Sequence, residues 1–441
     1  MRKDTDFAGI PDHWTVRSLA EVCSMQSGGT PPKSDQAMWA GSMPWVSGKD
    51  LKSPRLRDAI DHITPEAAQE FSKIAPAGTV LVLVRGMGLA NGFALSLIER
   101  PMAFNQDLKA LIPKDGLLGA FLMHALTFAG TRMLRNVADA AHGTKRLSQD
   151  DLDTFKIPIP PVAEQQAIAA VLDRCRERIE VEIASEKTAS ALRRTAMTRL
   201  FTRGLRGRRQ KDTEIGLLPA DWDVVRLDSC ANVISTRMSY SELEAVRPSS
   251  AHDAVPVLGI KVSDMNRPGN EVEISQAALV VPLDRSVAEH RCAPPGTIIF
   301  PKRGAAIATN KKRLATTWTV FDPNVIGVRS GASVNVRFLF HWFQNFDLRT
   351  ITEPGPTPQL NKKNLDPLLV PVPAEMAEQC EIVTALDAVG RQISLSRQKR
   401  AVANSLYTCV LHKLMSGEIR VDHLDLSALA DVAPLHQEAS A

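Results

Sequence analysis

The amino-acid sequence repeats itself once, with the same motifs in the same order. Three motifs of the first half return in the second half after nearly constant distances. Such a duplication predicts two similar folds with two similar surfaces, and two similar surfaces can read two similar targets. Pro11-Asp12-His13-Trp14 with Leu19 returns as Pro219-Ala220-Asp221-Trp222 with Leu227, Gly78-Thr79 to Arg85-Gly86 as Gly296-Thr297 to Arg303-Gly304, and Pro158-x-Pro160 before Glu164-Gln165 as Pro371-x-Pro373 before Glu378-Gln379.

Length and charge leave several classes of protein open. The chain has 441 residues, 44% of them hydrophobic, which is enough for several cores. Its formal net charge of +4 is compatible with a polyanionic partner but does not require one. Aromatic residues make up only 5%, which argues against a stacking platform for single-stranded nucleic acid.

The cysteines and the apolar segments favour a cytoplasmic protein. The six cysteines are scattered without a C-x2-C pair, so we expect no metal site and interpret them as small buried residues in a reducing compartment. The first residues lack the apolar run of a signal peptide, and no segment is apolar over the length of a membrane span. We therefore expect no membrane association.

Two kinds of segment alternate along the chain. The mixed segments contain short β-branched runs such as Thr79–Val84 and Thr297–Phe300, which predict buried strands, and Leu117–Leu134 has the length of one helix. Val255–Leu258 loosely matches Met43–Val46. We divide the chain into a first mixed domain (1–157), a first long helix (158–206), a basic linker (207–218), a second mixed domain (219–370), a second long helix (371–421) and a flexible tail (422–441).

The two long helices follow from apolar residues at helical spacing. Pro161 and Gly204 are residues that often begin and end a helix, and they bound the first one. The first stripe contains Ile168, Leu172, Cys175, Ile179 and Ile183 and thins toward Leu192, Met197 and Leu200, and the second contains Ile382, Leu386, Val389, Ile393, Leu406, Val410 and Leu414.

A long helix with one apolar stripe needs a partner. The other long helix is the nearest candidate, and we expect the two to run antiparallel about a pseudo-two-fold axis. The alternative is that each helix only covers its own domain. Two domains held apart by a stiff pair of helices resemble a ruler, and DNA presents its grooves to a two-fold protein again after about one turn.

In this order the motifs resemble the specificity subunit of type I restriction–modification systems. The resemblance covers nearly the whole chain, from about Ile10 to Val421. Its motifs are Pro11-x-x-Trp14 with Leu19, Ser27-Gly28-Gly29-Thr30-Pro31, Met43-Pro44-Trp45-Val46, Gly78-Thr79 to Arg85-Gly86, Asn105-Gln106-Asp107, Ile157-Pro158-Ile159-Pro160-Pro161 with Glu164-Gln165, and the closing Leu414-Met415-Ser416-Gly417-Glu418-Ile419-Arg420.

The resemblance implies an α+β protein with two target recognition domains separated by two long antiparallel, coiled-coil-like helices. Each domain would read one half of a bipartite, asymmetric site in double-stranded DNA, and the helices would dock DNA methyltransferase subunits. S-adenosylmethionine would bind to those subunits, and ATP and magnesium to restriction/translocase subunits, so this chain would hold no cofactor. The second copy departs from the pattern at Ile234–Arg237 and at Asp322-Pro323-Asn324.

The chain shows no motif for its own chemistry. It lacks an Asn/Asp-Pro-Pro-aromatic methyltransferase loop, a G-x4-G-K-[S/T] loop and histidines at ligand spacing, so we predict no catalytic residue. Two alternatives stay open. One is a self-contained DNA modification or cleavage enzyme of unfamiliar type, and the other is a structural protein whose helices bind other helices without DNA.

Cations in loops are the candidate DNA contacts, because Arg and Lys suit phosphates and guanine edges. Arg85 and Arg303 each follow a predicted buried strand and precede a glycine, and the segment 203–211 is also basic. Lys362–Lys363 stand in the place that matches Lys145–Arg146, and Lys49 and Lys261 stand in corresponding segments. Solvated surface cations are the alternative for each of them. The candidates are Lys49, Arg85, Lys145, Arg146, Lys261, Arg303, Lys311, Lys312, Arg313, Lys362 and Lys363.

Two Glu-Gln pairs at the starts of the long helices are candidates for docking the methyltransferase. They are Glu164-Gln165 and Glu378-Gln379. The alternative is structural, because a carboxylate in the first turn of a helix interacts favourably with the helix dipole.

Overall fold

The computed structural model describes residues 9–135, 137–139, 145–353, 355 and 358–421. The predicted tail 422–441 lies outside the described residues. The chain forms two compact units, which are residues 1–184 with 397–441 (unit 1) and residues 185–396 (unit 2). Each unit contains half of both long helices, so the units do not follow our division into domains and separate helices, and that division stays a prediction.

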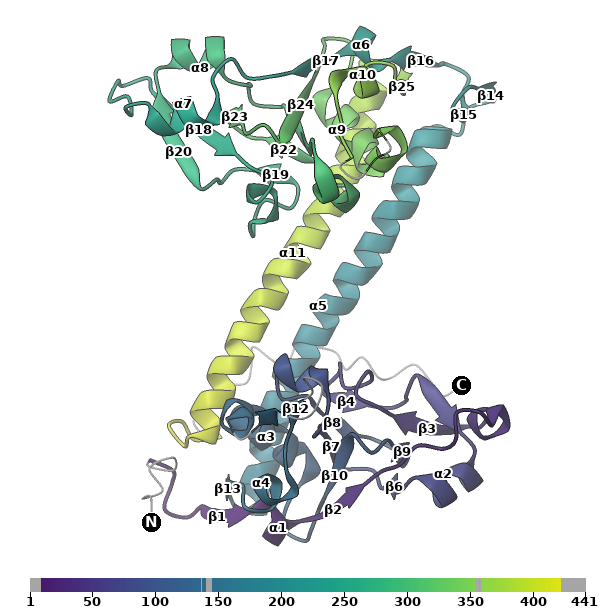
Figure 1. Cartoon of the computed structure of the whole chain (residues 1–441), viewed down its shortest axis with the longest axis vertical. Helices are drawn as coiled ribbons and strands as arrows, with labels where there is room; N and C mark the ends of the chain where they lie inside the picture. Colours follow the sequence, from purple (N-terminus) through teal and green to yellow (C-terminus); the bar gives the residue numbers. More distant parts are fainter. Residues whose placement is uncertain (1–8, 136, 140–144, 354, 356–357, 422–441) are drawn as a thin grey trace. The chain divides into compact units, whose positions relative to one another are not determined.

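Unit 1 contains two sheets and two strand pairs (Figure 1). One pair joins the segment after Trp14 to the segment before α5 (Val162–Arg203), so it closes the domain at its chain ends, and the other joins β11 (Ala138–Asp139) to β12 (Lys145–Arg146). The five-stranded sheet has the order β2 (Cys23–Ser27), β10 (Leu108–Pro113), β7 (Val80–Leu83), β8 (Leu95–Ile98), β4 (Arg55–Leu56), the four-stranded sheet has the order β5 (Asp61–Ile63), β3 (Met43–Val46), β9 (Met102–Phe104), β6 (Ile74–Ala75), and β1 (Thr15–Ser18) pairs with β13 (Lys156–Ile159).

Unit 2 repeats this arrangement, except that its second sheet has three strands where that of unit 1 has four. The segments 43–46 and 255–258 are equivalent, since β3 and β18 each pair with one antiparallel and one parallel neighbour. The strand orders are β17 (Ala231–Ile234), β24 (Val325–Ser330), β21 (Ile298–Pro301), β22 (Arg313–Ala315), β19 (Glu273–Ile274), then β20 (Leu279–Leu283), β18 (Val255–Ile260), β23 (Trp318–Phe321), and finally β16 (Trp222–Arg226) with β25 (Leu369–Pro373).

The expected buried strands and the expected helix are confirmed. All four residues of β7 and of β21 are buried, and α3 (Gly119–Leu134) occupies the predicted helix 117–134. The other helices are short: α1 (Leu19–Val22), α2 (Pro65–Phe71), α4 (Gln149–Asp153), α6 (Leu227–Cys230), α7 (Tyr240–Ala245), α8 (Arg285–Arg291), α9 (Val336–Asn345), α10 (Lys362–Leu365) and the 3-10 turns η2 (Gln36–Trp39), η3 (Met87–Ala90), η5 (Asp264–Asn266), η6 (Gly304–Thr309) and η7 (Leu348–Ile351).

Both predicted long helices are present, as α5 (Val162–Arg203) and α11 (Met376–Met415). The first helical residue of α5 follows Pro161 directly. Gly204 has φ +64°, the left-handed conformation that glycine adopts without a steric cost and that commonly ends a helix. The proline and the glycine therefore set both ends of α5.

In each unit, one half of α5 packs against the opposite half of α11, so the two helices run antiparallel. In unit 1 the core joins Leu172 and Ile179 of α5 to Tyr407 and Leu411 of α11. In unit 2 the core of the mixed domain includes residues of both helices, among them Phe201 and Leu386. Each half also packs against the core of its own domain, through α3 in unit 1 and α9 in unit 2. Both predicted arrangements therefore occur together.

The predicted apolar stripes are wrong at three positions. Ile183, Leu192 and Leu406 are 39%, 56% and 46% exposed. In unit 1, Ala403 and Tyr407 are buried between α11 and the rest of the core in place of Leu406. A pattern of large apolar residues alone does not predict that a small residue and a tyrosine take this position.

Two further expectations need correction. The basic linker includes a two-stranded hairpin of β14 (Gln210–Thr213) and β15 (Gly216–Pro219), so it is not a plain connector. Cys380 and Cys409 are exposed, whereas the other four cysteines are buried. No helix among the described residues combines the length and the apolar character that crossing a membrane would need.

Candidate nucleic-acid interface

In unit 1, backbone pairing brings three of the predicted cations together. Arg85, which follows β7, lies opposite Arg146 of β12 (Lys145–Arg146) in an antiparallel bridge. The Gly86 N–H donates to the carbonyl oxygen of Lys145 at 3.0 Å, and Gly86 has φ +124°. Both arginines are exposed, and the glycine lets the backbone turn away directly after Arg85. The result is a basic turn on the surface, which suits contact with phosphates.

Unit 2 keeps the turn but changes the residue opposite the arginine. Arg303 is exposed and lies opposite Gln359, and the Gly304 N–H donates to the carbonyl oxygen of Pro358 at 2.8 Å. The segment that matches Lys145–Arg146 is therefore Pro358–Gln359. This position corrects our expectation that Lys362–Lys363 occupy the matching place.

Lys362 and Lys363 lie after Pro358–Gln359 in the chain and are the first two residues of α10. They follow the helix cap Asn361, as Gln149 follows the cap Ser148 in unit 1. Both lysines are exposed and form ion pairs, Lys362 with Asp366 at 2.9 Å and Lys363 with Glu353 at 2.5 Å. Exposed pairs of this kind are weak, so both ammonium groups can exchange a carboxylate for a phosphate.

Lys49 and Lys261, which we expected in corresponding segments, lie there but are two residues apart in the repeat. The backbone N–H groups of Ser47 and Lys261 donate to the carboxylates of Asp50 and Asp264 at 2.8 and 2.9 Å, so Lys261 matches Ser47 rather than Lys49. Lys49 pairs with Asp61 at 2.6 Å, and the Lys261 ammonium lies 4.2 Å from the ring centre of Tyr240. Both lysines are exposed.

The cluster 311–313 is largely structural. Lys312 is only 1% exposed, and its ammonium donates to Asn310 Oδ1 at 2.8 Å and to the Phe346 carbonyl at 2.5 Å. Burial lowers the pKa of Lys312 to about 8. Arg313 donates to the Met265 carbonyl at 3.0 Å, and burial lowers its pKa as well. Neither position fits a DNA contact, which leaves the partly exposed Lys311, whose ammonium contacts Asn266.

Two further segments of unit 1, the loop 27–31 and the turn Asn105–Asp107, present polar residues at the surface. A side chain on Gly28 or Gly29 would lie 2.0 Å from a backbone oxygen, so the loop 27–31 requires glycine at both positions. It packs on the turn Asn105–Asp107, where Thr30 Oγ1 donates to Gln106 Oε1 at 2.5 Å. Gln106 is exposed and offers an amide to a base edge.

Unit 2 keeps the same turn with amide and carboxylate exchanged. The Asp107 N–H donates to Asn105 Oδ1 at 3.2 Å, and the Asn324 N–H donates to Asp322 Oδ1 at 2.7 Å. The residue between them is Gln106 in unit 1 and Pro323 in unit 2. The turn is therefore shared, whereas the side chain at its tip differs.

The glutamines of both Glu-Gln pairs are buried clamps. The side chain of Gln165 accepts from the Leu118 N–H at 2.9 Å and donates to the carbonyls of Gly116 and Pro160 at 2.8 and 2.9 Å. Gln379 accepts from the Asn335 N–H at 2.7 Å and donates to two carbonyls, of Ser333 and Pro373, at 3.2 and 3.1 Å. Both tie the start of a long helix to the loop before α3 or α9, and this burial does not suit a docking contact.

The glutamates are also used within the chain. Glu164 is partly exposed and accepts from Trp14 Nε1 at 3.2 Å, with His13 Nε2 at 2.8 Å from the same oxygen. Glu378 is buried, accepts from the Leu205 N–H at 3.4 Å, and lies 4.0 Å from Arg208. Of the four predicted docking residues, only Glu164 reaches the surface.

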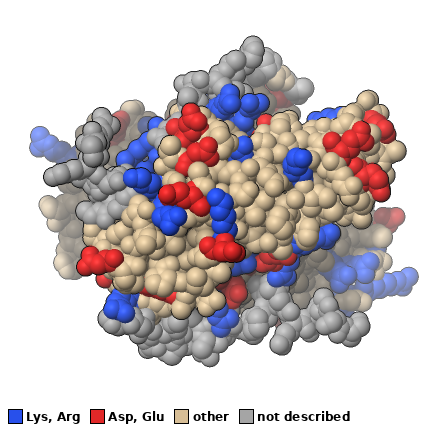
Figure 2. All heavy atoms as spheres, turned by 90° about the horizontal axis from the view of Figure 1, so that it is seen from below, with Lys and Arg blue, Asp and Glu red and all other residues tan. Residues whose placement is uncertain are grey.

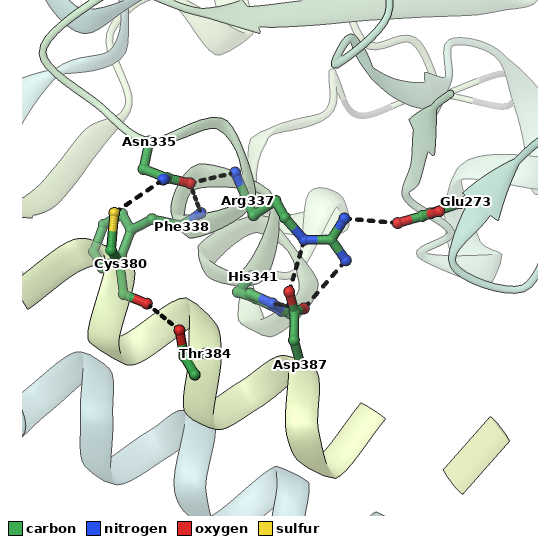
Figure 3. A network of polar contacts seen from close by, with 8 residues as sticks. All are labelled: Glu273, Asn335, Arg337, Phe338, His341, Cys380, Thr384 and Asp387. Carbon is green, nitrogen blue, oxygen red and sulfur yellow. Dashed lines mark hydrogen bonds and ion pairs between the residues drawn. The ribbon is translucent and has the colours of Figure 1, made fainter. Parts of the chain in front are cut away.

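The sequence analysis did not predict a polar network that joins each mixed domain to a long helix. In unit 2, His341 and Arg337 of α9 bind Asp387 of α11 at 2.9 and 2.8 Å, and Arg337 also binds Glu273 at 2.7 Å (Figure 3). Hydrogen bonds to His341 and Arg337 lower the pKa of Asp387 against the effect of burial. Isolated histidines give no signal of this pairing in the sequence.

Unit 1 builds the equivalent network from partly different residues. His124 Nε2 lies 3.0 Å from Asp173 Oδ1, and His124 Nδ1 lies 3.2 Å from the Tyr407 hydroxyl. Burial lowers the pKa of His124, while hydrogen bonds to His124 and Arg55 hold the pKa of Asp173 below its usual range although burial opposes this. Because an ionised Asp173 only accepts, Nε2 carries the proton and Nδ1 accepts from Tyr407.

The exposed charges do not form one uniform field on the face in view in Figure 2, where basic and acidic side chains are interspersed. Among the described residues, no group of three His, Cys, Asp or Glu is placed to hold a metal ion. Exposed loops of both units present cations and amides, the groups that suit phosphates and base edges.

A family model for the type I restriction modification DNA specificity domain matches residues 11–188 and 302–405, more than half of the chain. The chain belongs to this family. The two matched ranges contain Arg85, Arg146 and Arg303 and the start of each long helix, so both basic turns lie in the parts that match the family model.

Relatives of the specificity-domain family match different shares of the chain. The chain is 34% identical over 160 residues to the type I restriction enzyme EcoR124I/EcoR124II specificity subunit of Escherichia coli, a match that covers 36% of this chain and only 40% of that relative. It is 23% identical over 451 residues to the putative type I restriction enzyme MjaX specificity subunit of Methanocaldococcus jannaschii, covering 95% and 96%.

The fold is also found in a solved structure. The crystal structure of a type I restriction–modification system S subunit from M. genitalium matches with a TM-score of 0.60 and 15% identity, covering 92% of this chain and 96% of that one. At this identity the match establishes the fold of the specificity-domain family for nearly the whole chain.

Proposed function

We propose that this chain is the DNA-specificity subunit of a type I restriction–modification complex and reads a bipartite, asymmetric site in double-stranded DNA. The observation that carries the proposal is the repeated basic turn. Arg85 and Arg303 take equivalent places in two equivalent folds, each exposed and each followed by a glycine with positive φ. Two such turns give two DNA contacts of similar geometry.

The two units differ where sequence is read, which supports an asymmetric site. Opposite the arginine, unit 1 has Arg146 and unit 2 has Gln359. At the tip of the neighbouring turn, unit 1 has Gln106 and unit 2 has Pro323. Arg pairs with guanine, Gln pairs with adenine, and Pro donates to neither, so the two units present different donor patterns to base edges.

Exposed apolar residues of the long helices support the docking of methyltransferase subunits there. Val402, Leu406 and Cys409 of α11 follow helical spacing and are exposed, Val402 by 68%. Leu192 of α5 holds the place in unit 2 that Leu406 holds in unit 1, and it is exposed as well. We place the docking surface on these residues instead of the Glu-Gln pairs, because a row of exposed apolar side chains suits a protein partner.

In this proposal the chain performs no catalysis and acts in the cytoplasm, where the DNA lies. S-adenosylmethionine would bind to the methyltransferase subunits, and ATP and magnesium to the restriction/translocase subunits. What supports this proposal is that the repeated turns offer cations and amides, the groups that suit phosphates and base edges.

A gel shift and two activity assays test the proposal. The full chain is mixed with its methyltransferase subunit and with DNA fragments from its host, and sequence-dependent binding is expected only for the complex. The purified chain alone is then incubated with DNA and S-adenosylmethionine, or with DNA and magnesium. Methylation or cleavage by the chain alone would favour the alternative of a self-contained enzyme, and absence of any DNA binding by the complex would refute a specificity subunit.

A further inference from the structure

Unit 2 contains a cavity of about 390 Å³ whose lining is rich in arginine. It lies where the loop after β17, the end of α8 and the strand β24 come together. The charged or basic side chains around it are Arg237, Glu289, His290, Arg291 and Arg329, and the Cys292 thiol also lines it. Arg303 and Gly304 of the basic turn are not among the residues that line it.

Backbone hydrogen bonds hold this cavity in shape. The N–H groups of Arg237 and Met238 donate to the carbonyl oxygen of Arg291 at 2.9 and 3.1 Å, which fixes the loop against the end of α8. Arg329 is positioned by the sheet, opposite Asn232 of β17. The arginines therefore project from three fixed segments of backbone.

The charges around the cavity do not cancel. Arg291 donates to Glu242 at 2.9 Å, and hydrogen bonds from Ser239 lower the pKa of Glu242 to about 2, so this pair is ionised and balanced at neutral pH. Arg237 and Arg329 are exposed and have no ion pair within the part of the chain that the structure describes. Against them stands one carboxylate, that of Glu289, which leaves an excess of positive charge.

The arginines are specific to the second copy of the repeat. Arg329 pairs with Asn232, and the equivalent pair in unit 1 is Ile112 with Ser24. The Arg237 N–H donates to the Arg291 carbonyl oxygen, so the loop after β17 contacts the end of α8. The equivalent contact in unit 1 is between Gly29 and Phe71 at the end of α2, where a side chain on Gly29 would lie 2.0 Å from the Phe71 carbonyl oxygen. Gly29, Phe71 and Ile112 thus stand where unit 2 has three arginines.

We propose that this cavity binds a phosphodiester group of the DNA backbone and gives the second recognition domain a phosphate contact that the first one lacks. The inference rests on the proposed function. Guanidinium groups bind phosphate oxygens through paired N–H donors, and the excess charge favours an anion. A base is a poorer ligand, because no Phe, Tyr or Trp is among the described residues that line the cavity.

The test measures how DNA binding by the full chain with its methyltransferase subunit depends on salt. The variant is Arg237→Gln with Arg329→Gln, and the matched control is Arg285→Gln, which removes an exposed arginine at the opposite end of α8. The affinity K falls as salt increases, and losing one phosphate contact is expected to make the slope of log K against log salt shallower by about 1. The loss should weaken binding to cognate and to unrelated DNA about equally. The control is expected to leave both unchanged.

A second arm separates DNA from free phosphate. Arg329→Gln alone leaves the loop residue Arg237 unchanged and so guards against a folding defect of that loop, and thermal unfolding is recorded with and without inorganic phosphate. An unchanged salt slope of DNA binding in both variants would overturn the inference. This holds even if the variants lose stabilisation by inorganic phosphate, because the cavity would then bind free phosphate and not DNA. Failure of the unsubstituted complex to bind DNA would instead overturn the proposed function.

Discussion

At the scale of single residues, backbone geometry decides which predicted contacts are available. Arg85 and Arg303 could be predicted from the sequence, because a strand followed by Arg-Gly marks a turn. Lys312 could not be separated from its neighbours, since only the fold shows that its ammonium is enclosed by Asn310 and the Phe346 carbonyl. A run of cations in a sequence therefore does not distinguish a surface from a buried hydrogen-bond donor.

Replacing the arginine of either basic turn is expected to weaken DNA binding. Arg85→Ala and Arg303→Ala should each lower the affinity of the complex with methyltransferase for cognate DNA about tenfold, about 1.4 kcal/mol, because each removes a cation from a turn that we propose contacts the duplex. Arg17→Ala is the control, since Arg17 is exposed and pairs only with Glu21 on its own segment. The affinity is measured by gel shift at fixed salt, and equal affinity of all three variants would exclude the turns as contacts.

The stability of unit 1 should fall on mild acidification because of His124. Burial lowers the pKa of His124 in the folded chain, so below the unfolded value of about 6.5 the unfolded chain binds a proton that the folded chain does not. The groups that face the ring are Asp173 and Arg176 of α5, Tyr407 of α11 and Arg55. The lowered pKa of Asp173 adds a separate loss only near and below pH 4.

Urea unfolding between pH 7.5 and 5.5 measures this effect. The free energy of unfolding should decrease toward pH 5.5, with a slope of at most about 1.36 kcal/mol per pH unit from this one histidine. His124→Gln should be less stable at pH 7.5 but less dependent on pH over this range. A variant with the same pH slope as the unsubstituted chain would show that another group causes the dependence.

At the scale of elements, the long helices could be predicted from the sequence, but their contacts with each other and with the domains could not. Apolar spacing predicts α5 and α11, and Pro161 and Gly204 predict the ends of α5. The stripe fails at Leu192 and Leu406, because side chains such as Ala403 and Tyr407 fill the contact and release leucines to the surface. The Glu-Gln motif was visible, but only the hydrogen bonds of its glutamine show that it joins helix to domain.

Removing a glutamine clamp is expected to destabilise its own unit. Gln165→Ala and Gln379→Ala each leave three backbone groups without their partner in a buried site, at a cost of about 3 kcal/mol in the free energy of unfolding. Urea unfolding monitored by circular dichroism measures the loss. Gln149→Ala, at an exposed position of α4, should change little, and a loss as large as in the clamp variants would contradict the assigned role.

An acidic residue on the exposed face of the helices should prevent docking without disturbing the fold. Leu406→Asp and Leu192→Asp place a charge where we propose that a methyltransferase subunit covers apolar surface, and desolvating that charge should weaken association at least tenfold. Analytical ultracentrifugation of the mixture measures association, and thermal unfolding of the free chain reports the fold. Unchanged association of both variants would place the docking surface elsewhere.

At the scale of the whole molecule, the repeat predicts more than any single motif. The sequence was sufficient for two similar domains and two long helices, because the duplicated motifs carry both. It was not sufficient for the correspondence of individual residues, since insertions shift Lys49 against Lys261 and Lys145–Arg146 against Lys362–Lys363. The differences between the units, rather than their similarity, are where sequence preference is expected to lie.

Lengthening both long helices should change the spacing of the target and nothing else. Ser185 of α5 and Ser396 of α11 share a hydrogen bond of 2.9 Å, so seven helical residues inserted beside each serine keep the two helices in step. The insertion adds about 10.5 Å, or about three base pairs. Methylated sites of the variant should show the same half-sites with a longer gap, and altered half-sites with the old gap would show that the helices do not set it.

Sequencing of methylated positions tests the central claim of two unlike readers most directly. Genomic DNA is taken from cells that carry this chain with its methyltransferase subunit and from cells that lack the chain. The account predicts methylated sites that share two short, unequal sequences separated by a constant number of unspecified base pairs. One contiguous sequence, two identical half-sites, or methylation that does not depend on the chain would contradict it.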